Sequence, residues 1–65
     1  MKIIVNGEQL NSKSFSLYDL VVEYELSSQL VVAEVDGKII DRSKWKETAL
    51  QEDMQIELVH FVGGG

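Results

Sequence analysis

The sequence contains no cysteine, a single histidine and no long hydrophobic run. The absence of cysteine excludes disulfides, thiolate metal ligands, a cysteine nucleophile and a persulfide carrier. Every apolar run is far shorter than the roughly 20 residues of a membrane-spanning helix, and the first residues do not resemble a secretion signal. We therefore expect a cytoplasmic protein whose fold depends on side-chain packing alone.

Basic residues are also few, because six Lys and Arg stand against eleven Asp and Glu, for a net charge of −5. Such a chain repels phosphate backbones and anionic lipid headgroups, so nucleic acid and membranes are poor partners. If it docks on another protein, a basic face on that partner would speed the encounter. Acidity that only keeps the domain soluble is an equally good explanation.

Little in the sequence could build a catalytic site. His60 is the only candidate base, and its place beside Phe61 on an expected strand favours a half-exposed sheet or interface side chain. There is no glycine-rich phosphate loop between a strand and a helix, and no spaced set of metal ligands. We expect a chain that is not an enzyme and holds no cofactor or metal.

Two dipeptides, Asn6-Gly7 and Asp36-Gly37, predict β-hairpins. Each stands between two extended runs, and a type I′ turn needs positive φ at both of its central residues, which these types adopt readily. In the first hairpin, period-two alternation places one set of apolar side chains toward the core. That set is Met1, Ile3 and Val5.

The stretch "FSLYDLVVEYEL" predicts a helix from about Leu17 to Glu25, with Ser27-Ser28 ending it. Ser16 is the expected N-cap, with Asp19 completing a pair like a capping box and Phe15 packing on Leu20 as a hydrophobic staple. The apolar stripe at helical spacing consists of Leu17, Leu20, Val21 and Tyr24.

The last apolar run alternates through Met54, Ile56 and Leu58 and then becomes uniformly apolar, which predicts a central strand. The polar segment before it predicts a loop with a short helical turn around Trp45. The order hairpin, helix, hairpin, loop, strand predicts an α+β fold of the β-grasp (ubiquitin-like) type, a mixed sheet of about five strands crossed by one main helix. Residues 1–62 would form this domain, with first and last strands parallel, and residues 63–65 a flexible glycine tail.

The chain ends on "HFVGGG", so its last reactive group is the α-carboxylate of Gly65. Three extended glycines would reach about 10 Å beyond the last strand. Because they lack Cβ, Gly63 and Gly64 could thread a narrow channel in a partner and present the carboxylate there. A glycine end can equally be an inert terminus, but a strand that runs into it without a polar spacer favours the carrier interpretation.

The sequence resembles the ThiS family, the small sulfur carriers of thiamine biosynthesis. The resemblance covers the whole chain: its length, Asn6-Gly7, "VAEVDGKII", Arg42-x-x-Trp45 in "DRSKW", and the ending "IELVHFVGGG". Many members have proline where this chain has Asp41, and many end in two glycines where this one has three.

This resemblance implies a mechanism in which the chain is a substrate and a sulfur carrier, and never the catalyst. A ThiF-like adenylyltransferase uses MgATP to convert the terminal carboxylate into an acyl-adenylate. A cysteine desulfurase or another donor then supplies sulfur, giving a thiocarboxylate at Gly65, and thiazole synthase (ThiG-like) takes that sulfur into the thiazole ring of thiamine.

We expect the partner interface beside the tail. If Ile4, Val59 and Phe61 face away from the helix, they form an uncovered apolar patch, whereas a different strand register would bury Phe61. Trp45 is expected to cap the core and Arg42 to pair with a carboxylate, with direct partner contact by both as the alternative.

Three other functions remain open. The chain could carry sulfur for molybdopterin or another pathway, it could be a ubiquitin-like modifier joined to lysines, or it could be a β-grasp interaction module with an inert tail.

Overall fold

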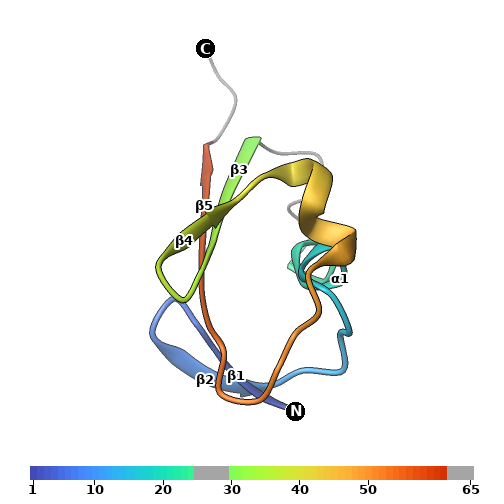
Figure 1. Ribbon diagram of the computed structural model, residues 1–65. Coiled ribbons are helices and arrows are strands. Elements are labelled where there is room, and N and C mark those ends of the chain that lie inside the picture. Colours follow the sequence, from blue (N-terminus) through green and yellow to red (C-terminus); the bar gives the residue numbers. More distant parts are fainter. Residues whose placement is uncertain (25–29, 62–65) are drawn as a thin grey trace.

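The computed structural model describes residues 1–24 and 30–61, which form one mixed β-sheet with two helical segments on one side of it (Figure 1). Residues 25–29 and 62–65 lie outside the described part. The elements in chain order are β1 (Lys2–Val5), β2 (Glu8–Asn11), α1 (Leu17–Glu23), β3 (Leu30–Val35), β4 (Lys38–Ile40), the 3-10 helix η1 (Arg42–Glu47) and β5 (Gln55–Phe61).

The five strands stand in the order β2-β1-β5-β3-β4. β1 and β5 are parallel, and every other neighbouring pair is antiparallel. The first and last strands therefore lie side by side in the middle of the sheet, as the right-handed crossover rule predicts. This arrangement, with α1 across one face, confirms the predicted β-grasp architecture.

Both hairpins turn where the sequence predicts. Asn6 and Gly7 have φ angles of 52° and 85°, and Asp36 and Gly37 have 48° and 86°. Positive φ at both central residues is the mark of a type I′ turn. These two dipeptides thus fix the pairing of β1 with β2 and of β3 with β4.

The core lies between the sheet and the two helical segments. Ser16 caps α1 by accepting a hydrogen bond from the backbone N–H of Asp19, so the predicted start of the helix is confirmed. The helix ends earlier than predicted, at Glu23, because Tyr24 already leaves the helical conformation as its C-cap. The buried apolar residues are Ile3, Val5, Leu17, Leu20, Val21, Val31, Ala33, Val35, Trp45, Leu50, Ile56 and Leu58.

Tyr24, at the end of the predicted helical stripe, is 38% exposed, because as the C-cap it lies past the last buried turn. The predicted terminator Ser27-Ser28 lies outside the described residues.

Two other burial predictions are wrong. Met1 is 46% exposed, since it precedes β1 and contributes its backbone carbonyl, which accepts from the N–H of Ser12. Phe15 is 81% exposed, so the expected staple with Leu20 is absent. The backbone at Phe15 is instead held by the N–H of Leu50, which donates to its carbonyl at 2.9 Å, and the side chain points away from the core.

Candidate functional site

The segment that precedes the terminal glycines is β5, so the geometry of this strand defines the candidate site. β3 runs beside β5 as far as the pair Leu30–Phe61. The predicted carrier residue Gly65 and the predicted threading residues Gly63 and Gly64 lie outside the described residues.

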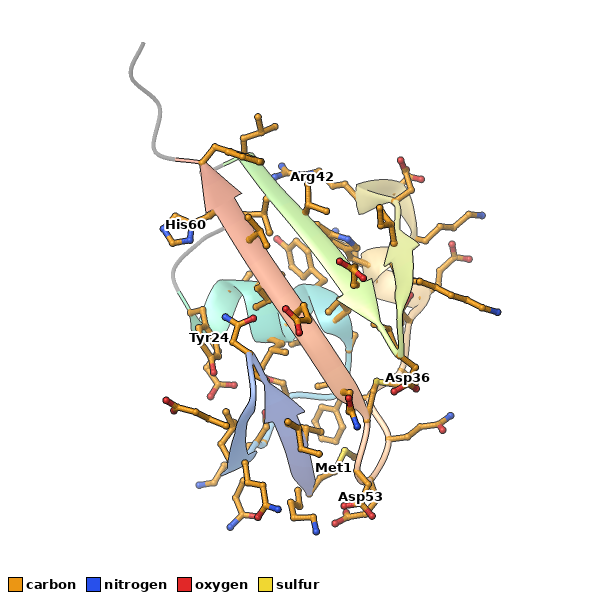
Figure 2. All side chains as sticks on the ribbon, turned by 90° about the vertical axis from the view of Figure 1, so that its left-hand side faces the viewer. Met1, Tyr24, Asp36, Arg42, Asp53 and His60 are labelled. Atoms are coloured by element: carbon orange, nitrogen blue, oxygen red, sulfur yellow. The ribbon has the colours of Figure 1, made fainter. Side chains whose placement is uncertain are left out.

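The outer face of the sheet, turned away from α1, carries an apolar patch beside the end of β5 (Figure 2 looks onto this face). On β5 and β3 the side chains alternate between the core and this face, so Phe61 pairs with Leu30 there and Val59 with Val32. Ile39 of β4 is 71% exposed on the same face, opposite Glu34. We call this set the outer-face patch: Leu30, Val32, Ile39, Val59 and Phe61.

Two of the three predicted apolar interface residues belong to the outer-face patch. Val59 and Phe61 are 46% and 51% exposed, so the alternative in which Phe61 is buried is wrong. Ile4 also faces away from the core, but it pairs with Gln55 at the opposite end of β5 and is half-buried, so it does not continue the patch.

Sequence reasoning missed Leu30, Val32 and Ile39. The signal was present in the β3 sequence, where alternate residues 31, 33 and 35 are buried and the apolar residues between them must face the other way.

Trp45 and Arg42 form a stacked pair next to the core. The Trp45 side chain is 2% exposed, and its indole N–H donates to the carbonyl of Ile40 at 3.0 Å. The Arg42 guanidinium lies 5.0 Å from the centre of the Trp45 ring, within cation–π range. The prediction that Trp45 caps the core is confirmed. Arg42, by contrast, is exposed.

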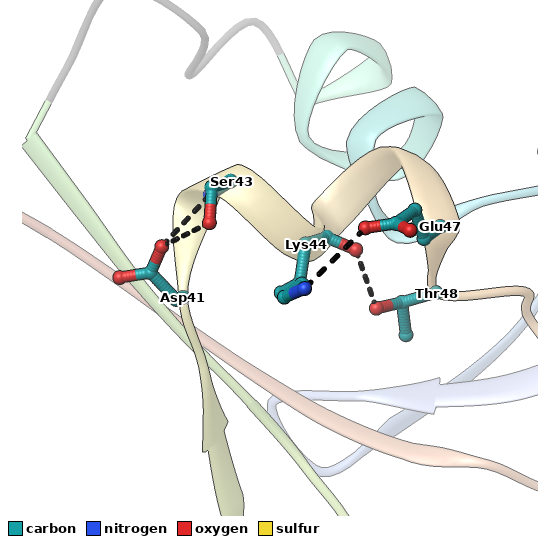
Figure 3. A network of polar contacts seen from close by, with 5 residues as sticks. All are labelled: Asp41, Ser43, Lys44, Glu47 and Thr48. Carbon is teal, nitrogen blue, oxygen red and sulfur yellow. Dashed lines mark hydrogen bonds and ion pairs between the residues drawn. The ribbon is translucent and has the colours of Figure 1, made fainter.

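A short polar network holds η1, the element that buries Trp45 (Figure 3). Asp41 is its N-cap, and the carboxylate accepts hydrogen bonds from the hydroxyl and the backbone N–H of Ser43. These bonds, the hydroxyl one foremost, lower the pKa of Asp41 below its ordinary value of 3.8. At the other end, the Thr48 hydroxyl donates to the Lys44 carbonyl at 2.8 Å. Asp41 thus starts the helical turn, with φ of −62°, an angle proline also adopts.

The turn residue Asn6 also contacts β5 directly. Its Oδ1 accepts a hydrogen bond from the backbone N–H of Leu58 at 2.9 Å, and its Nδ2 donates to the Leu58 carbonyl at 3.3 Å. The side-chain amide therefore takes the place that a further peptide group of β1 would occupy.

Asp36, the equivalent residue of the second hairpin, contacts β5 from the other side. Its backbone N–H donates to the Gln55 carbonyl at 2.8 Å, and its carboxylate accepts from the Gln55 N–H at 3.1 Å. The two hairpin turns thus fix the position of β5 from both of its edges.

His60 is the residue before the last of β5, opposite Val31 of β3, and its side chain is exposed (Figure 2). Within residues 1–24 and 30–61, no group of three His, Cys, Asp or Glu side chains could hold a metal ion. No helix in this part of the chain is long and apolar enough to cross a membrane.

Comparison with known proteins matches this chain to a family over nearly its whole length. The sequence model of the ThiS family matches residues 3–65. The chain belongs to the ThiS family. The sulfur carrier protein ThiS of Bacillus subtilis is 35% identical over 63 residues, an alignment that covers 94% of this chain and 96% of that protein. This ThiS chain is therefore a homologue of a small sulfur carrier protein.

A second kind of relative is much longer. The thiazole synthase of Magnetococcus marinus is 38% identical over 66 aligned positions, which cover 100% of this chain but 20% of that protein. This ThiS chain therefore spans about a fifth of the length of that relative.

The fold has a counterpart among solved structures. The crystal structure of the thiamine biosynthesis protein ThiS from Geobacter metallireducens matches with a TM-score of 0.82 over 100% of both chains, at 22% sequence identity. At this identity the likeness shows the fold, and it is the β-grasp fold that the strand order gives.

Proposed function

We propose that this ThiS chain carries sulfur for the thiazole moiety of thiamine as a thiocarboxylate on Gly65. The observation that carries the proposal is the position of β5: a central strand, fixed from both edges, that leads within one residue to the terminal glycines. The family match extends through those glycines to residue 65.

The chemistry begins from an unreactive anion. A ThiF-like adenylyltransferase, using MgATP, joins the Gly65 carboxylate to AMP and releases pyrophosphate, which makes the carbonyl carbon electrophilic. The sulfur of the donor then attacks the carbonyl carbon and displaces AMP. Where the donor is the persulfide of a cysteine desulfurase, the product is an acyl disulfide, and a thiol reduces it to leave the thiocarboxylate. Thiazole synthase (ThiG-like) accepts this sulfur, and the carboxylate is returned for another cycle.

The contribution of the chain is to deliver its terminus. Glycine has no Cβ, so Gly63 and Gly64 let the backbone pass through a channel too narrow for other residues and approach a nucleotide closely. A β-branched residue at the end would shield the carbonyl carbon from AMP transfer and from sulfur.

The outer-face patch is the proposed docking surface for these enzymes. It is apolar and it adjoins the strand that leads to the tail. Glu34 and Glu57 stand directly opposite each other beside it, so a partner surface with an apolar centre and basic margin would fit. Arg42, supported by the Trp45 ring, and Ile4 at the far end of β5 are proposed as outlying contacts.

Thiazole synthase is the partner with the most direct support, because a stretch similar to this whole chain is part of the Magnetococcus marinus protein of that name. We place the reaction in the cytoplasm, where the adenylyltransferase would find MgATP.

The test is the intact mass of the protein purified from its own cells. The proposal predicts a fraction heavier by one exchange of oxygen for sulfur, which rises when thiazole synthase is deleted because the sulfur then has no acceptor. Accumulation on deletion of a molybdopterin synthase instead would assign the carrier to that pathway. Lysine-linked conjugates without any thiocarboxylate would overturn the proposal in favour of a protein modifier.

A further inference from the structure

Asn6-Gly7 is a chemically labile dipeptide as well as a turn. The backbone nitrogen of a glycine can attack the side-chain amide carbon of a preceding asparagine, because the glycine has no Cβ to hinder the approach. The sequence has one other asparagine, Asn11. It precedes Ser12, which has a side chain and whose N–H donates to the Met1 carbonyl at 2.9 Å. By its neighbour, Asn6 is therefore the more reactive of the two amides.

The reaction is a deamidation, and its only co-reactant is water. The Gly7 nitrogen bonds to Cγ of Asn6, and its proton leaves with the amide nitrogen as ammonia, which closes a five-membered succinimide ring. Water then adds to either ring carbonyl and breaks the bond from that carbon to the nitrogen, which regains a proton. The product is aspartate or isoaspartate at position 6. Asn6 and Gly7 are both exposed, so water reaches the turn.

The conformation of the turn opposes ring closure. The ring forms only when Cβ of Asn6 eclipses the Gly7 nitrogen about the Cα–C bond. The φ angles of 52° and 85° identify a type I′ turn, which holds its first central residue at ψ of about +30°. At that angle Cβ lies nearly opposite the nitrogen, so the turn must open before the ring can form.

The side-chain amide of Asn6 is also bound to β5. Its Oδ1 accepts from the Leu58 N–H at 2.9 Å, and its Nδ2 donates to the Leu58 carbonyl at 3.3 Å. Both hydrogen bonds must break before Cγ can reach the Gly7 nitrogen. Because Leu58 lies in the central strand, the reaction requires the first hairpin turn and β5 to separate locally.

We propose that Asn6 is a modification site whose deamidation is limited by the separation of the turn from β5, and whose product cannot restore the contact. Aspartate at position 6 would set a carboxylate oxygen against the Leu58 carbonyl, in place of a donor. Isoaspartate would add a methylene to the backbone of the turn. Deamidation therefore permanently removes one of the two contacts that fix β5, and this inference holds whatever the chain carries.

The second hairpin provides a comparison within the same molecule. Asp36 and Gly37 have nearly the same turn angles, 48° and 86°. The Asp36 side chain makes one hydrogen bond to β5, from the Gln55 N–H at 3.1 Å, and the Gln55 carbonyl already accepts from the Asp36 backbone N–H. Asp36→Asn would therefore place an amide in the same kind of turn with one side-chain bond to β5 instead of two.

The first test compares the folded and the unfolded full-length chain. Both are incubated at the same mildly alkaline pH, one in buffer and one in guanidinium chloride, and the peptide that contains position 6 is analysed for isoaspartate and for the exchange of its amide for a carboxyl. We expect deamidation of Asn6 to be slower in the folded chain by about tenfold or more. Equal rates would overturn the proposal, because the fold would then give no protection.

The Asp36→Asn variant separates the Leu58 bonds from the turn conformation. Positions 6 and 36 then each carry an amide before a glycine in a type I′ turn, and both are measured in one sample. We expect deamidation at position 36 to be about three- to tenfold faster than at Asn6, the value of one further hydrogen bond. Equal rates, or a faster reaction at Asn6, would contradict the proposal, since the bonds to Leu58 would not limit the reaction.

The deamidated fraction, separated by anion exchange, tests the fate of the contact. In this fraction we expect the Leu58 amide hydrogen to exchange about tenfold faster than in fresh protein. The amide of Val59, which pairs with Val32 of β3, is the internal reference. Unchanged exchange at Leu58 would show that the product restores the contact and would refute this part of the proposal.

Discussion

The side-chain amide of Asn6 accepts from the N–H of Leu58 at 2.9 Å and donates to the carbonyl of Leu58 at 3.3 Å, across a separation of 52 residues. One residue therefore forms a type I′ turn and also completes the pairing of the central strand. Asp36 occupies the same turn position in the second hairpin but only accepts from Gln55 with its side chain. The two turns are alike in the sequence, but the first needs a side chain that both donates and accepts, whereas the second needs only an acceptor.

Exchanging the acid and the amide at these turns should therefore have unequal effects. Asn6→Asp keeps a residue that suits a type I′ turn but sets a carboxylate oxygen against the Leu58 carbonyl, and we expect it to lower the free energy of unfolding by roughly 1–2 kcal/mol. Asp36→Asn retains an acceptor for the Gln55 N–H, so we expect it to change the free energy of unfolding by less than about 0.5 kcal/mol. Urea denaturation of both variants makes the comparison. Equal losses would show that the donor of Asn6 contributes nothing.

The start of α1 gives a second comparison, between an exposed and a buried residue. Phe15 is 81% exposed and Leu20 fully buried. We expect Phe15→Ser to change the free energy of unfolding by less than about 0.5 kcal/mol, and Leu20→Ala to lower it by about 2–5 kcal/mol through the cavity it leaves. A loss above about 1 kcal/mol for Phe15→Ser would mean that a staple contact forms in solution.

The capping of η1 should depend on pH. Because the folded-state pKa of Asp41 lies below 3.8, its capping bonds stabilise the fold above the unfolded pKa, and this contribution is lost as the pH falls through the folded value. Ser43→Ala removes the hydroxyl that lowers the pKa most, so the Asp41 carboxyl should titrate at higher pH in that variant. NMR titration of the carboxyl carbon measures this directly. An unchanged titration curve would exclude the hydroxyl as the cause.

The outer-face patch should matter for binding and little for stability. Phe61→Ser removes a half-exposed ring, and we expect at least tenfold weaker binding to the adenylyltransferase or to thiazole synthase, with little change in the urea midpoint. Phe15→Ser is the matched control, since it removes a more exposed ring from another part of the surface. If both variants weaken binding equally, the effect is one of general hydrophobicity and the patch is not the docking surface.

Local patterns in the sequence predicted most of the fold. The two turn dipeptides, the Ser16 cap and the alternation of β5 each specify structure through residues close in the chain. The two hairpins fix two strand pairs, and the right-handed crossover rule then places β1 beside β5. The exposure of Phe15 and Met1 depends on contacts distant in sequence, and so does the strand register that brings Leu30, Val32 and Ile39 together on one face. The carbonyl of Phe15 accepts from the backbone N–H of Leu50, and no pattern near residue 15 reveals this contact.

In the candidate site, too, local patterns predicted some residues, whereas others depend on tertiary contacts. The sequence predicted Val59 and Phe61 because both lie on the strand that ends in the glycines. Their neighbours Leu30 and Val32 come from a strand whose register with β5 is a tertiary property. The hydrogen bonds between the Asn6 amide and Leu58 could not be predicted either, because the turn alone accounts for an Asn-Gly dipeptide.

The most direct test of the carrier claim is to incubate the full-length chain with the ThiF-like adenylyltransferase, MgATP and a sulfur source, and to measure its intact mass. We predict a gain equal to one exchange of oxygen for sulfur, and no gain for a chain extended by one alanine after Gly65 that remains folded by circular dichroism. If the extended chain is charged with sulfur as readily as the natural one, the terminal carboxylate is not the carrier.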